Sequence, residues 1–568
     1  MVRKKHGQDK AVRDFKFGYF SRTGNEFFLN DDMNKAIDSY NEALAIRPLS
    51  ADILSNRGAA FLRVRDYHKA LADLRAVVEL EIKQNVSVTI KTLHRFCKAK
   101  CALKKYDGEM FGLLQAAAIW YQEHGPRSEL QEIYSLIVTS RRMQKESSTG
   151  IYDMTHLLMR QCQVYSCGEY HGAVEIIEEH EKGRLTVARS PFKTGRVILG
   201  CKAFAMAFPR PKSSSIFGPE KGDQQNDSNE EVSEDDYIKQ NFVRLAVTIA
   251  DMMVSNSELA HAVYELGSTG TDSNNDVSGS ESTTSFERLH RIVLQNGIVS
   301  ASNPDPRKPP SPAEVDDRVS RNTCGLWLLP SYLNHSCVDT NAEVQRFGDL
   351  TIVRASRDIS PGEEILVSYM HKSRVELECT SSVVEELKER ESLLCKCRLC
   401  KLVKQEPANV KQRRYELLEA AKISQDEDLE DIEIELEALR ANNTDLNFPI
   451  FSLCRKIASY YSSCQIGMYK KAAIYFEKAY NLTHFSGLSR QRIRLAMEIC
   501  MCYLQAMDNE KSKEWAYKLR DDLKTTYGSN VEMLVPIIAN TENMTIDVNT
   551  MSNLIWNIST PDTDDDYY

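Results

Sequence analysis

The chain has 568 residues, which is too long for a single hydrophobic core and predicts three or four domains. Its 72 basic and 81 acidic side chains leave a formal net charge of −9, which argues against a nucleic-acid-binding protein that works through bulk positive charge. The sequence contains no apolar run of 18 residues and no cleavable leader pattern, so we expect a soluble protein of the cytoplasm or nucleus without membrane contact.

A 34-residue repeat organises the N-terminal part. Small and aromatic residues recur at matching positions of two consecutive repeats, which begin at Phe17 and Ala51: Gly24, Phe27, Ala36, Tyr40, Ala43 and Pro48 in the first, and Gly58, Phe61, Ala70 and Leu74 in the second. This spacing is typical of the tetratricopeptide repeat (TPR), in which small residues let two antiparallel helices approach closely. We expect TPR repeats over 1–125, the third of them degenerate, and a helical connector over 126–182.

The centre of the chain, from about residue 183, has the pattern of a β-rich domain. Short β-branched runs punctuated by glycine predict strands near 183–207 and 342–369, and the stretch 237–266 between them is helical in pattern. Three polar low-complexity segments interrupt this centre and are expected to be surface insertions: 211–237, 267–285 and 301–317.

Helical character returns after residue 405. Tyr469, Ala472, Phe476 and Ala479 have the spacing of the second TPR helix, so we expect a TPR-like helical domain over 406–555 and a disordered acidic tail over 556–568. The predicted fold class is therefore α+β multidomain, with an N-terminal TPR solenoid, a central β-rich domain at 183–370 and a C-terminal helical domain.

Three cysteines lie within six residues in the run CKCRLC, at Cys395, Cys397 and Cys400. In a reducing compartment most of the 15 cysteines are expected to be packing thiols, but a cluster this tight can converge on one zinc ion. A closed structural site takes four ligands, so one must come from elsewhere; Cys337, Cys379, Cys324, other cysteines and the histidines all stay open. Three chance surface thiols are the alternative.

The order of three motifs resembles that of SET-domain protein lysine methyltransferases. The motifs are NHSC at 334–337, GEEILVSY at 362–369 and the Cys-x-Cys-x-x-Cys of residues 395–400. With flanking TPR-like helices and an interrupted centre, the chain is most similar to the SET and MYND (SMYD) group. It departs from that group because no cysteine lies between Cys201 and Cys324, which leaves no MYND zinc module.

The resemblance implies two bound groups, S-adenosylmethionine (SAM) and one structural zinc, and a post-SET zinc-binding segment over 371–405. The implied zinc ligands are Cys337, Cys395, Cys397 and Cys400, and the implied catalytic residue is Tyr369. The implied SAM-binding residues are Gly183, Arg184, Asn296, Asn334, His335, Tyr369 and Leu393. Without the resemblance, Asn334 is equally a turn cap, His335 and Tyr369 are packing residues, and Cys337 is a buried thiol.

Two departures bear on the cofactor site. The family's Gly-x-Gly-Leu signature is reduced to Gly183-Arg184-Leu185, without its second glycine, and Leu393 stands where relatives often place an aromatic residue against the adenine. A third departure is the sequence NHSCVDTN, in which one extra residue precedes Asn341, so the turn after Cys337 is expected to differ.

The resemblance implies SAM-dependent methylation of a lysine on a histone or another protein, by a chain that we expect to be a monomer and to hold a further partner on its TPR surfaces. The acidic helices could favour a lysine-rich substrate, or they are simply solvated faces. The alternative is a TPR scaffold with a weak or inactive SET domain. A zinc-dependent hydrolase is excluded if four thiolates close the metal site, because no position remains for water.

Overall fold

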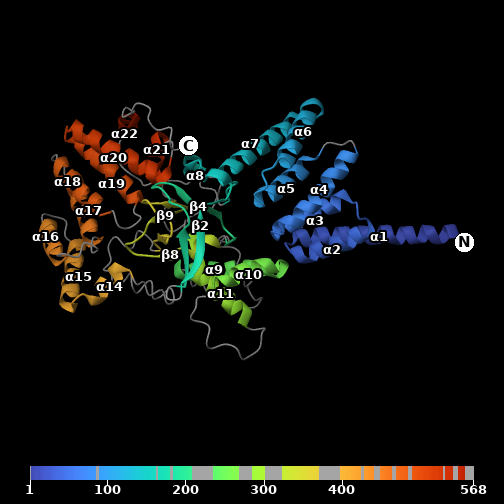
Figure 1. Ribbon diagram of the computed structural model, residues 1–568, viewed down its shortest axis with the longest axis horizontal. Helices are drawn as coiled ribbons and strands as arrows, with labels where there is room; N and C mark the ends of the chain where they lie inside the picture. Colours follow the sequence, from blue (N-terminus) through green and yellow to red (C-terminus); the bar gives the residue numbers. More distant parts are fainter. Residues whose placement is uncertain are drawn as a thin grey trace, which may run out of the picture.

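The structure is a computed structural model in which three parts follow one another along the long axis (Figure 1). Helices of the N-terminal part lie at one end, strands occupy the middle, and helices of the C-terminal part lie at the other end. The described residues are 2–84, 88–160, 164–179, 183–207, 234–267, 284–300, 323–369, 397–423, 428–440, 448–463, 468–483, 489–528, 531–541 and 548–556.

The N-terminal part is a stack of antiparallel helix pairs, as the 34-residue repeat predicts. Its helices are α1 (Val2–Leu29), α2 (Met33–Ile46), α3 (Ala51–Arg63), α4 (Tyr67–Lys83), α5 (Ile90–Ala102), α6 (Gly108–His124) and α7 (Arg127–Thr149). A Cβ at Gly24 would come within 2.6 Å of the Tyr40 ring, so only glycine lets α1 and α2 pack this closely. Asp32, Asp66 and Asp107 each cap the second helix of a pair through a backbone N–H three residues later.

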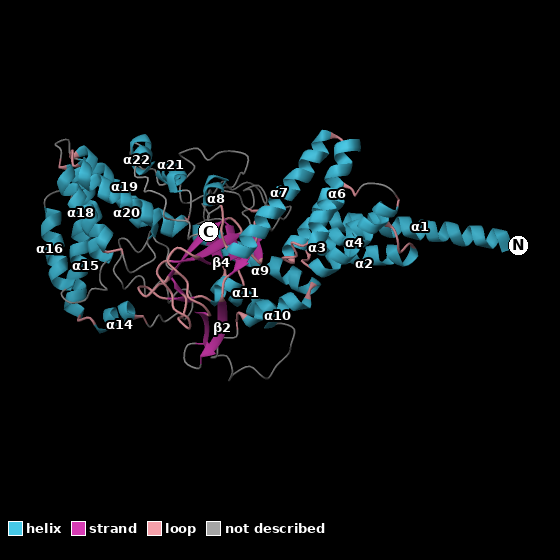
Figure 2. Ribbon diagram, turned by 45° about the horizontal axis from the view of Figure 1, so that its top comes forward, coloured by secondary structure: helices cyan, strands magenta, loops and turns pink. Residues whose placement is uncertain are grey.

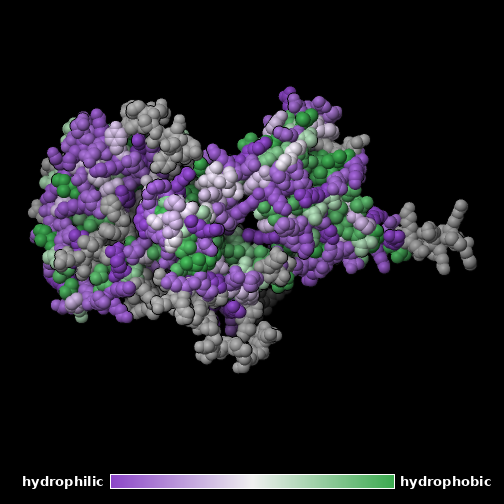
Figure 3. All heavy atoms as spheres, viewed as in Figure 1, coloured by the Kyte–Doolittle hydropathy of each residue, from purple (hydrophilic) through white to green (hydrophobic). Residues whose placement is uncertain are grey.

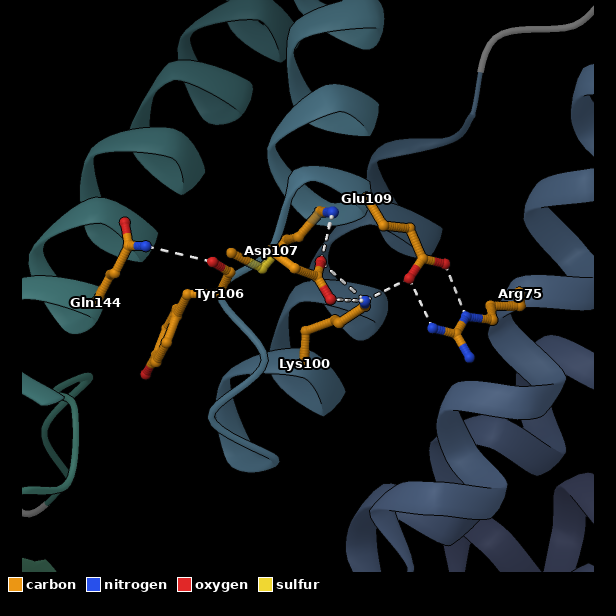
Figure 4. A network of polar contacts seen from close by, with 7 residues as sticks. Arg75, Lys100, Tyr106, Asp107, Glu109 and Gln144 are labelled. Carbon is orange, nitrogen blue, oxygen red and sulfur yellow. Dashed lines mark hydrogen bonds and ion pairs between the residues drawn. The ribbon is translucent and has the colours of Figure 1, made fainter. Parts of the chain in front are cut away.

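A buried cation fixes the third helix pair (Figure 4). Lys100 on α5 has no exposed surface, and its ammonium group pairs with Asp107 at 2.7 Å and with Glu109. Arg75 on α4 forms two parallel bonds to the same Glu109, at 2.7 and 2.6 Å, and lowers the pKa of that carboxyl to about 2. The network therefore joins the second and third repeats through charges that neutralise one another.

Strands begin earlier than the sequence predicts. After α8 (Met154–Arg160), residues 170–179 form β1 (Tyr170–His171) and β2 (Val174–Glu179), so the predicted helical connector does not continue to 182. The acidic run VEIIEE has no clear strand pattern of its own, but all six of its residues pair with β3 (Gly183–Ala188). The tertiary partner, rather than local propensity, decides this segment.

Small sheets make up the centre, and they lie between the two helical parts (Figure 2). The remaining strands are β4 (Val197–Lys202), β5 (Ala205–Ala207), β6 (Ile298–Ser300), β7 (Thr323–Leu326), β8 (Asn334–His335), β9 (Ala342–Phe347), β10 (Leu350–Ala355) and β11 (Leu366–Val367). One antiparallel sheet has the order β1-β4-β10-β9, another has β5-β7-β6, β2 pairs with β3, and β8 runs parallel to β11.

Three helices from the centre pack against the β5-β7-β6 sheet: α9 (Glu234–Ser255), α10 (Ser257–Glu265) and α11 (Thr284–Asn296). They confirm the helical pattern at 237–266. Because α9 begins at Glu234 and α11 at Thr284, two predicted insertions end slightly earlier than expected. The rest of 211–233 and 268–283, and all of 301–317, lie outside the described residues.

The C-terminal helices share one core with the central sheet. They are α14 (Arg398–Gln405), α15 (Ala408–Ile423), α16 (Asp428–Arg440), α17 (Phe448–Ser463), α18 (Tyr469–Asn481), α19 (Ser489–Gln505), α20 (Asn509–Tyr527), α21 (Val531–Thr541) and α22 (Val548–Trp556). Phe347, Leu350 and Ile352 of β9 and β10 belong to the apolar cluster of these helices. Within the described part of the chain, no helix is both long and apolar enough to cross a membrane.

Candidate functional site

The NHSC motif forms a turn that lies directly beside the end of the GEEILVSY motif. Asn334 and His335 make up β8, which pairs in parallel with Leu366 and Val367 of β11. A four-residue 3-10 helix, Leu329–Tyr332, leads into β8. Two segments about thirty residues apart in the chain are thus held in a fixed register by backbone hydrogen bonds.

Asn341 anchors the far side of this turn in spite of the extra residue before it. The residue is 1% exposed, and its carboxamide accepts the Leu366 N–H at 2.8 Å. The same side chain donates to the Glu363 carboxylate at 3.0 Å and to the Glu364 carbonyl at 2.8 Å. The residues between Cys337 and Asn341 therefore leave this asparagine fully bonded to the neighbouring motif.

Asn334 uses its amide protons to join three segments. Its Nδ2 donates to the Arg184 carbonyl at 3.0 Å and to the Glu364 carboxylate at 2.9 Å. These bonds bring the start of β3 to the NHSC turn and fix the carboxamide plane. The carboxamide oxygen remains as an acceptor, which suits the ammonium group at the methionine end of SAM.

His335 and Tyr369 pack against each other. Their rings stack with centroids 5.2 Å apart, and the Tyr369 backbone N–H donates to His335 Nδ1 at 3.0 Å, closer than the Val367 carbonyl at 3.3 Å. Because Nδ1 accepts, the ring proton is on Nε2, which lies 3.2 Å from Cys337 Sγ and donates to it. Burial lowers the pKa of His335, which keeps the ring neutral in this arrangement.

The Tyr369 hydroxyl points back into the same turn, where it donates to the Leu333 carbonyl. Burial of the hydroxyl, together with the nearby Glu364 carboxylate, raises the pKa of Tyr369 to about 12. Although 37% of the residue's surface is exposed, the phenol is therefore neutral at pH 7. Because this neutral phenol already donates its proton to the Leu333 carbonyl, it can position a substrate group by accepting a hydrogen bond from that group.

In the shortened glycine signature, Gly183 has a backbone conformation that favours glycine, and Leu185 has regular strand geometry. Gly183 has φ of +75°, which favours glycine, whereas Leu185 is 4% exposed and pairs with Ile177. The Arg184 guanidinium lies over the Tyr332 ring, 5.6 Å from its centroid, and donates to the Glu265 carbonyl. Arg184 thus reaches the site through its backbone carbonyl, which accepts from the Asn334 side chain.

Three of the four predicted zinc ligands meet in space. The sulfur atoms of Cys337, Cys397 and Cys400 all lie within 4.8 Å of one another, and those of Cys337 and Cys400 are 3.7 Å apart. A tetrahedral zinc site with bonds of about 2.3 Å to sulfur requires sulfur–sulfur edges of about 3.8 Å. The thiols therefore fit a zinc ion, and the structure joins residues 63 positions apart in the sequence.

Three further site residues stay predictions. Cys395 and Leu393 lie outside the described residues. Asn296 ends α11, and its amide donates to the Ile292 carbonyl of its own helix at 3.0 Å.

Sequence reasoning missed three residues that the structure places at the site. Glu364 orients Asn334, and Tyr332 lies beneath the Arg184 guanidinium. Asp339, in the turn between Cys337 and Asn341, accepts a hydrogen bond at 2.9 Å from Nε of Arg398, a residue that lies between the zinc-ligand candidates Cys397 and Cys400 in the sequence. Glu364 lies within the GEEILVSY motif, which could have indicated it. Arg398, the partner of Asp339, is 59 residues away in the sequence, and no local pattern indicates this contact.

Comparisons with known proteins agree with the motif order. The SET-domain family model matches residues 183–370, and a TPR-repeat model matches residues 24–64. A protein named "Methyltransferase" from Gibberella zeae is 22% identical over 408 residues, which cover 67% of this chain and 52% of that protein. The chain thus spans about half the length of this curated relative.

Two further similarities are one to a TPR protein and one to a solved structure. Tetratricopeptide repeat protein 28 of Mus musculus is 44% identical over 65 residues, which are 11% of this chain and 3% of that protein. The crystal structure of yeast Tom70 aligns with 96% of this chain and 100% of that chain at 12% identity, with a TM-score of 0.22, which is too low to indicate a shared fold. Residues 183–370 of this chain thus match a SET domain, and residues 24–64 match TPR repeats.

Proposed function

We propose that this chain is a SAM-dependent protein-lysine N-methyltransferase. The observation that carries the proposal is the position of Tyr369, whose ring stacks on His335 while its hydroxyl bonds to the Leu333 carbonyl. The SET-domain match and the methyltransferase relative support methyl transfer as the reaction type.

Groups that suit SAM converge beside Tyr369. The carboxamide oxygen of Asn334 suits an ammonium group, and the Glu364 carboxylate adds negative charge next to it. Gly183 has a positive φ, and a Cβ at this position would meet no atom within 4 Å, so the start of β3 leaves room for close approach. When bound there, SAM supplies a methyl group that is activated by the positive charge of its sulfonium.

The chain's own contribution is to hold a neutral lysine amine in line with that methyl group. An unperturbed lysine has a pKa of about 10.4, so keeping it neutral at pH 7 requires about 4–5 kcal/mol from burial and from repulsion by a nearby cation. The neutral phenol of Tyr369 and the Leu333 carbonyl can accept N–H bonds from the amine and orient its lone pair. The tyrosine need not act as a base, because an amine that the site keeps neutral already has a free lone pair for the methyl group.

Zinc would be held by Cys337, Cys397 and Cys400, with Cys395 as the fourth ligand. The metal would tie α14 to the NHSC turn and so stabilise the segment next to Tyr369. His335, which donates to the Cys337 sulfur, would stabilise that thiolate.

The proposed substrate is a histone or another protein with an accessible lysine, met in the cytoplasm or nucleus, and the TPR surfaces would hold a protein partner. Tyr369→Phe tests the reaction, with Tyr415→Phe, at an exposed tyrosine of α15, as the matched control. With labelled SAM and a lysine-rich protein mixture, we expect label transfer by the parent and by the control, and a loss of more than about a hundredfold in Tyr369→Phe. Most of the activity surviving in Tyr369→Phe would refute the assignment.

A scaffold with an inactive SET domain is the second candidate, because Leu185 replaces a signature glycine with a buried side chain. Calorimetry with SAM separates the two functions. SAM binding by both the parent and Tyr369→Phe supports the enzyme. If the parent neither binds SAM nor transfers the label, the result supports the scaffold.

A further inference from the structure

The strand β2 is the outer edge of a small sheet. On one side it pairs with β3 over all six residues, from Val174↔Ala188 to Glu179↔Gly183. The other side of β3 is covered by residues 362–365, because Ile365 N–H donates to the Thr186 carbonyl and Ala188 N–H to the Glu363 carbonyl. In the part of the chain that the structure describes, β3 is the sole strand partner of β2, which therefore presents a backbone edge for a further strand.

Most side chains of β2 are exposed, which is unusual for a strand that pairs with a largely buried strand. Ile176 and Ile177 are 39% and 40% exposed and point to opposite faces of the ribbon, although their partners Thr186 and Leu185 are buried. Hydrophobic surface does lie among hydrophilic surface in the central region of the molecule (Figure 3), and β2, which is paired with β3, projects away from the strands around β4 (Figure 2). Two exposed isoleucines on one edge strand are apolar area that a docked strand would cover.

The remaining exposed side chains of β2 are acidic: Glu175, Glu178 and Glu179. Glu175 has one weak ion pair, at 3.7 Å to the exposed Arg189. Glu178 lies opposite Arg184 in the register, but that guanidinium is turned toward Glu265 and Tyr332. The edge therefore carries an acid–apolar–apolar–acid–acid sequence along its length.

We propose that the β2 edge docks an extended, basic segment of a protein partner by adding it as a strand. In a paired strand each side chain lies beside the residue opposite, so an antiparallel partner would read basic–basic–apolar–apolar–basic. Each basic residue would then face a glutamate, and the two apolar residues would cover Ile176 and Ile177.

A second copy of this chain fits the edge poorly. Antiparallel self-pairing centred on Ile177 would place Glu175 of each copy opposite Glu179 of the other, and like charges directly opposite one another destabilise a strand pair. Charge complementarity thus selects a basic partner.

The full-length protein and fluorescent peptides test this docking. The probe contains Lys-Lys-Val-Val-Lys within a short neutral peptide, and its matched control contains Glu-Glu-Val-Val-Glu. By fluorescence anisotropy at low salt, we expect the basic peptide to bind at least about tenfold more tightly than the acidic one, with affinity falling as salt rises. A basic peptide that is N-methylated at alternate amides keeps its charges but cannot pair as a strand, so it should not bind.

Charge reversal at Glu175, Glu178 and Glu179 to lysine provides the decisive variant. The variant should no longer bind the basic peptide and should instead bind the acidic one. An unfolded protein would not acquire this binding of the acidic peptide. Equal binding of the methylated and unmethylated basic peptides, or binding unchanged by the reversal, would overturn the proposal. Because the readout is binding without SAM, its failure is independent of the methyltransferase proposal.

Discussion

Among the single residues, Cys337 is the position where the cofactor side and the metal side of the site meet. It follows Asn334 and His335 in the turn, and its sulfur contacts that of Cys400, which lies 63 residues later in the sequence. We expect Cys337→Ser to reduce the zinc content from about one ion per chain to a small fraction, because a hydroxyl is a poor zinc ligand. Metal analysis of the purified protein measures this, with the buried Cys454→Ser on α17 as the control. Unchanged zinc in Cys337→Ser would exclude it as a ligand.

The turn between Cys337 and Asn341 also contacts the zinc-ligand segment through Asp339. Asp339 bonds to Arg398, which places the turn next to the helix that begins between the two zinc-ligand candidates. Because the pair is exposed, we expect Asp339→Asn to weaken zinc affinity by only about threefold. Competition with a chromophoric chelator measures the change, and the reversed pair Asp339→Arg with Arg398→Asp should restore affinity. Arg413→Ala breaks a comparable exposed ion pair between α15 and Glu435 of α16 and should have no effect on zinc affinity.

Among the helices and strands, the close packing of α1 on α2 depends on Gly24. The Tyr40 ring that a Cβ would strike is 1% exposed, and its hydroxyl donates to Asn25 at 2.8 Å, so the ring cannot move aside. We expect Gly24→Ala to destabilise the N-terminal helices by about 1–3 kcal/mol. Gly18→Ala on the same helix meets no atom within 4 Å and should stabilise α1 by up to about 1 kcal/mol. Thermal unfolding followed by circular dichroism compares the two, and equal shifts would contradict the packing argument.

Across the molecule as a whole, a buried carboxyl group links the TPR solenoid to the β-rich centre. Glu146 of α7 is 5% exposed and accepts the Gly168 N–H at 2.7 Å, beyond α8. Burial raises the pKa of Glu146 from 4.5 to about 7, although Arg142 and Lys202 lower it and Asp153 raises it further.

The folded chain therefore keeps a proton on Glu146 that the unfolded chain releases between about pH 4.5 and 7. Stability should fall as pH rises through this window, by up to about 3 kcal/mol. Glu146→Gln can still accept the Gly168 N–H, so it should unfold at the same urea concentration at low pH and at a higher one than the parent above pH 7. Parallel urea profiles for the parent and the variant at all pH values would rule out this role.

The helical repeats, the central strands after residue 183 and the three motifs can be read from the sequence alone, because helix and strand periods and glycine punctuation are local properties of the chain. Other features depend on contacts between distant segments. VEIIEE became a strand because β3 lies beside it, and Cys337 meets Cys397 and Cys400 because the chain path returns after sixty or more residues. The direction of the Tyr369 hydroxyl and the partner of Asp339 likewise follow from tertiary packing, which no local pattern encodes.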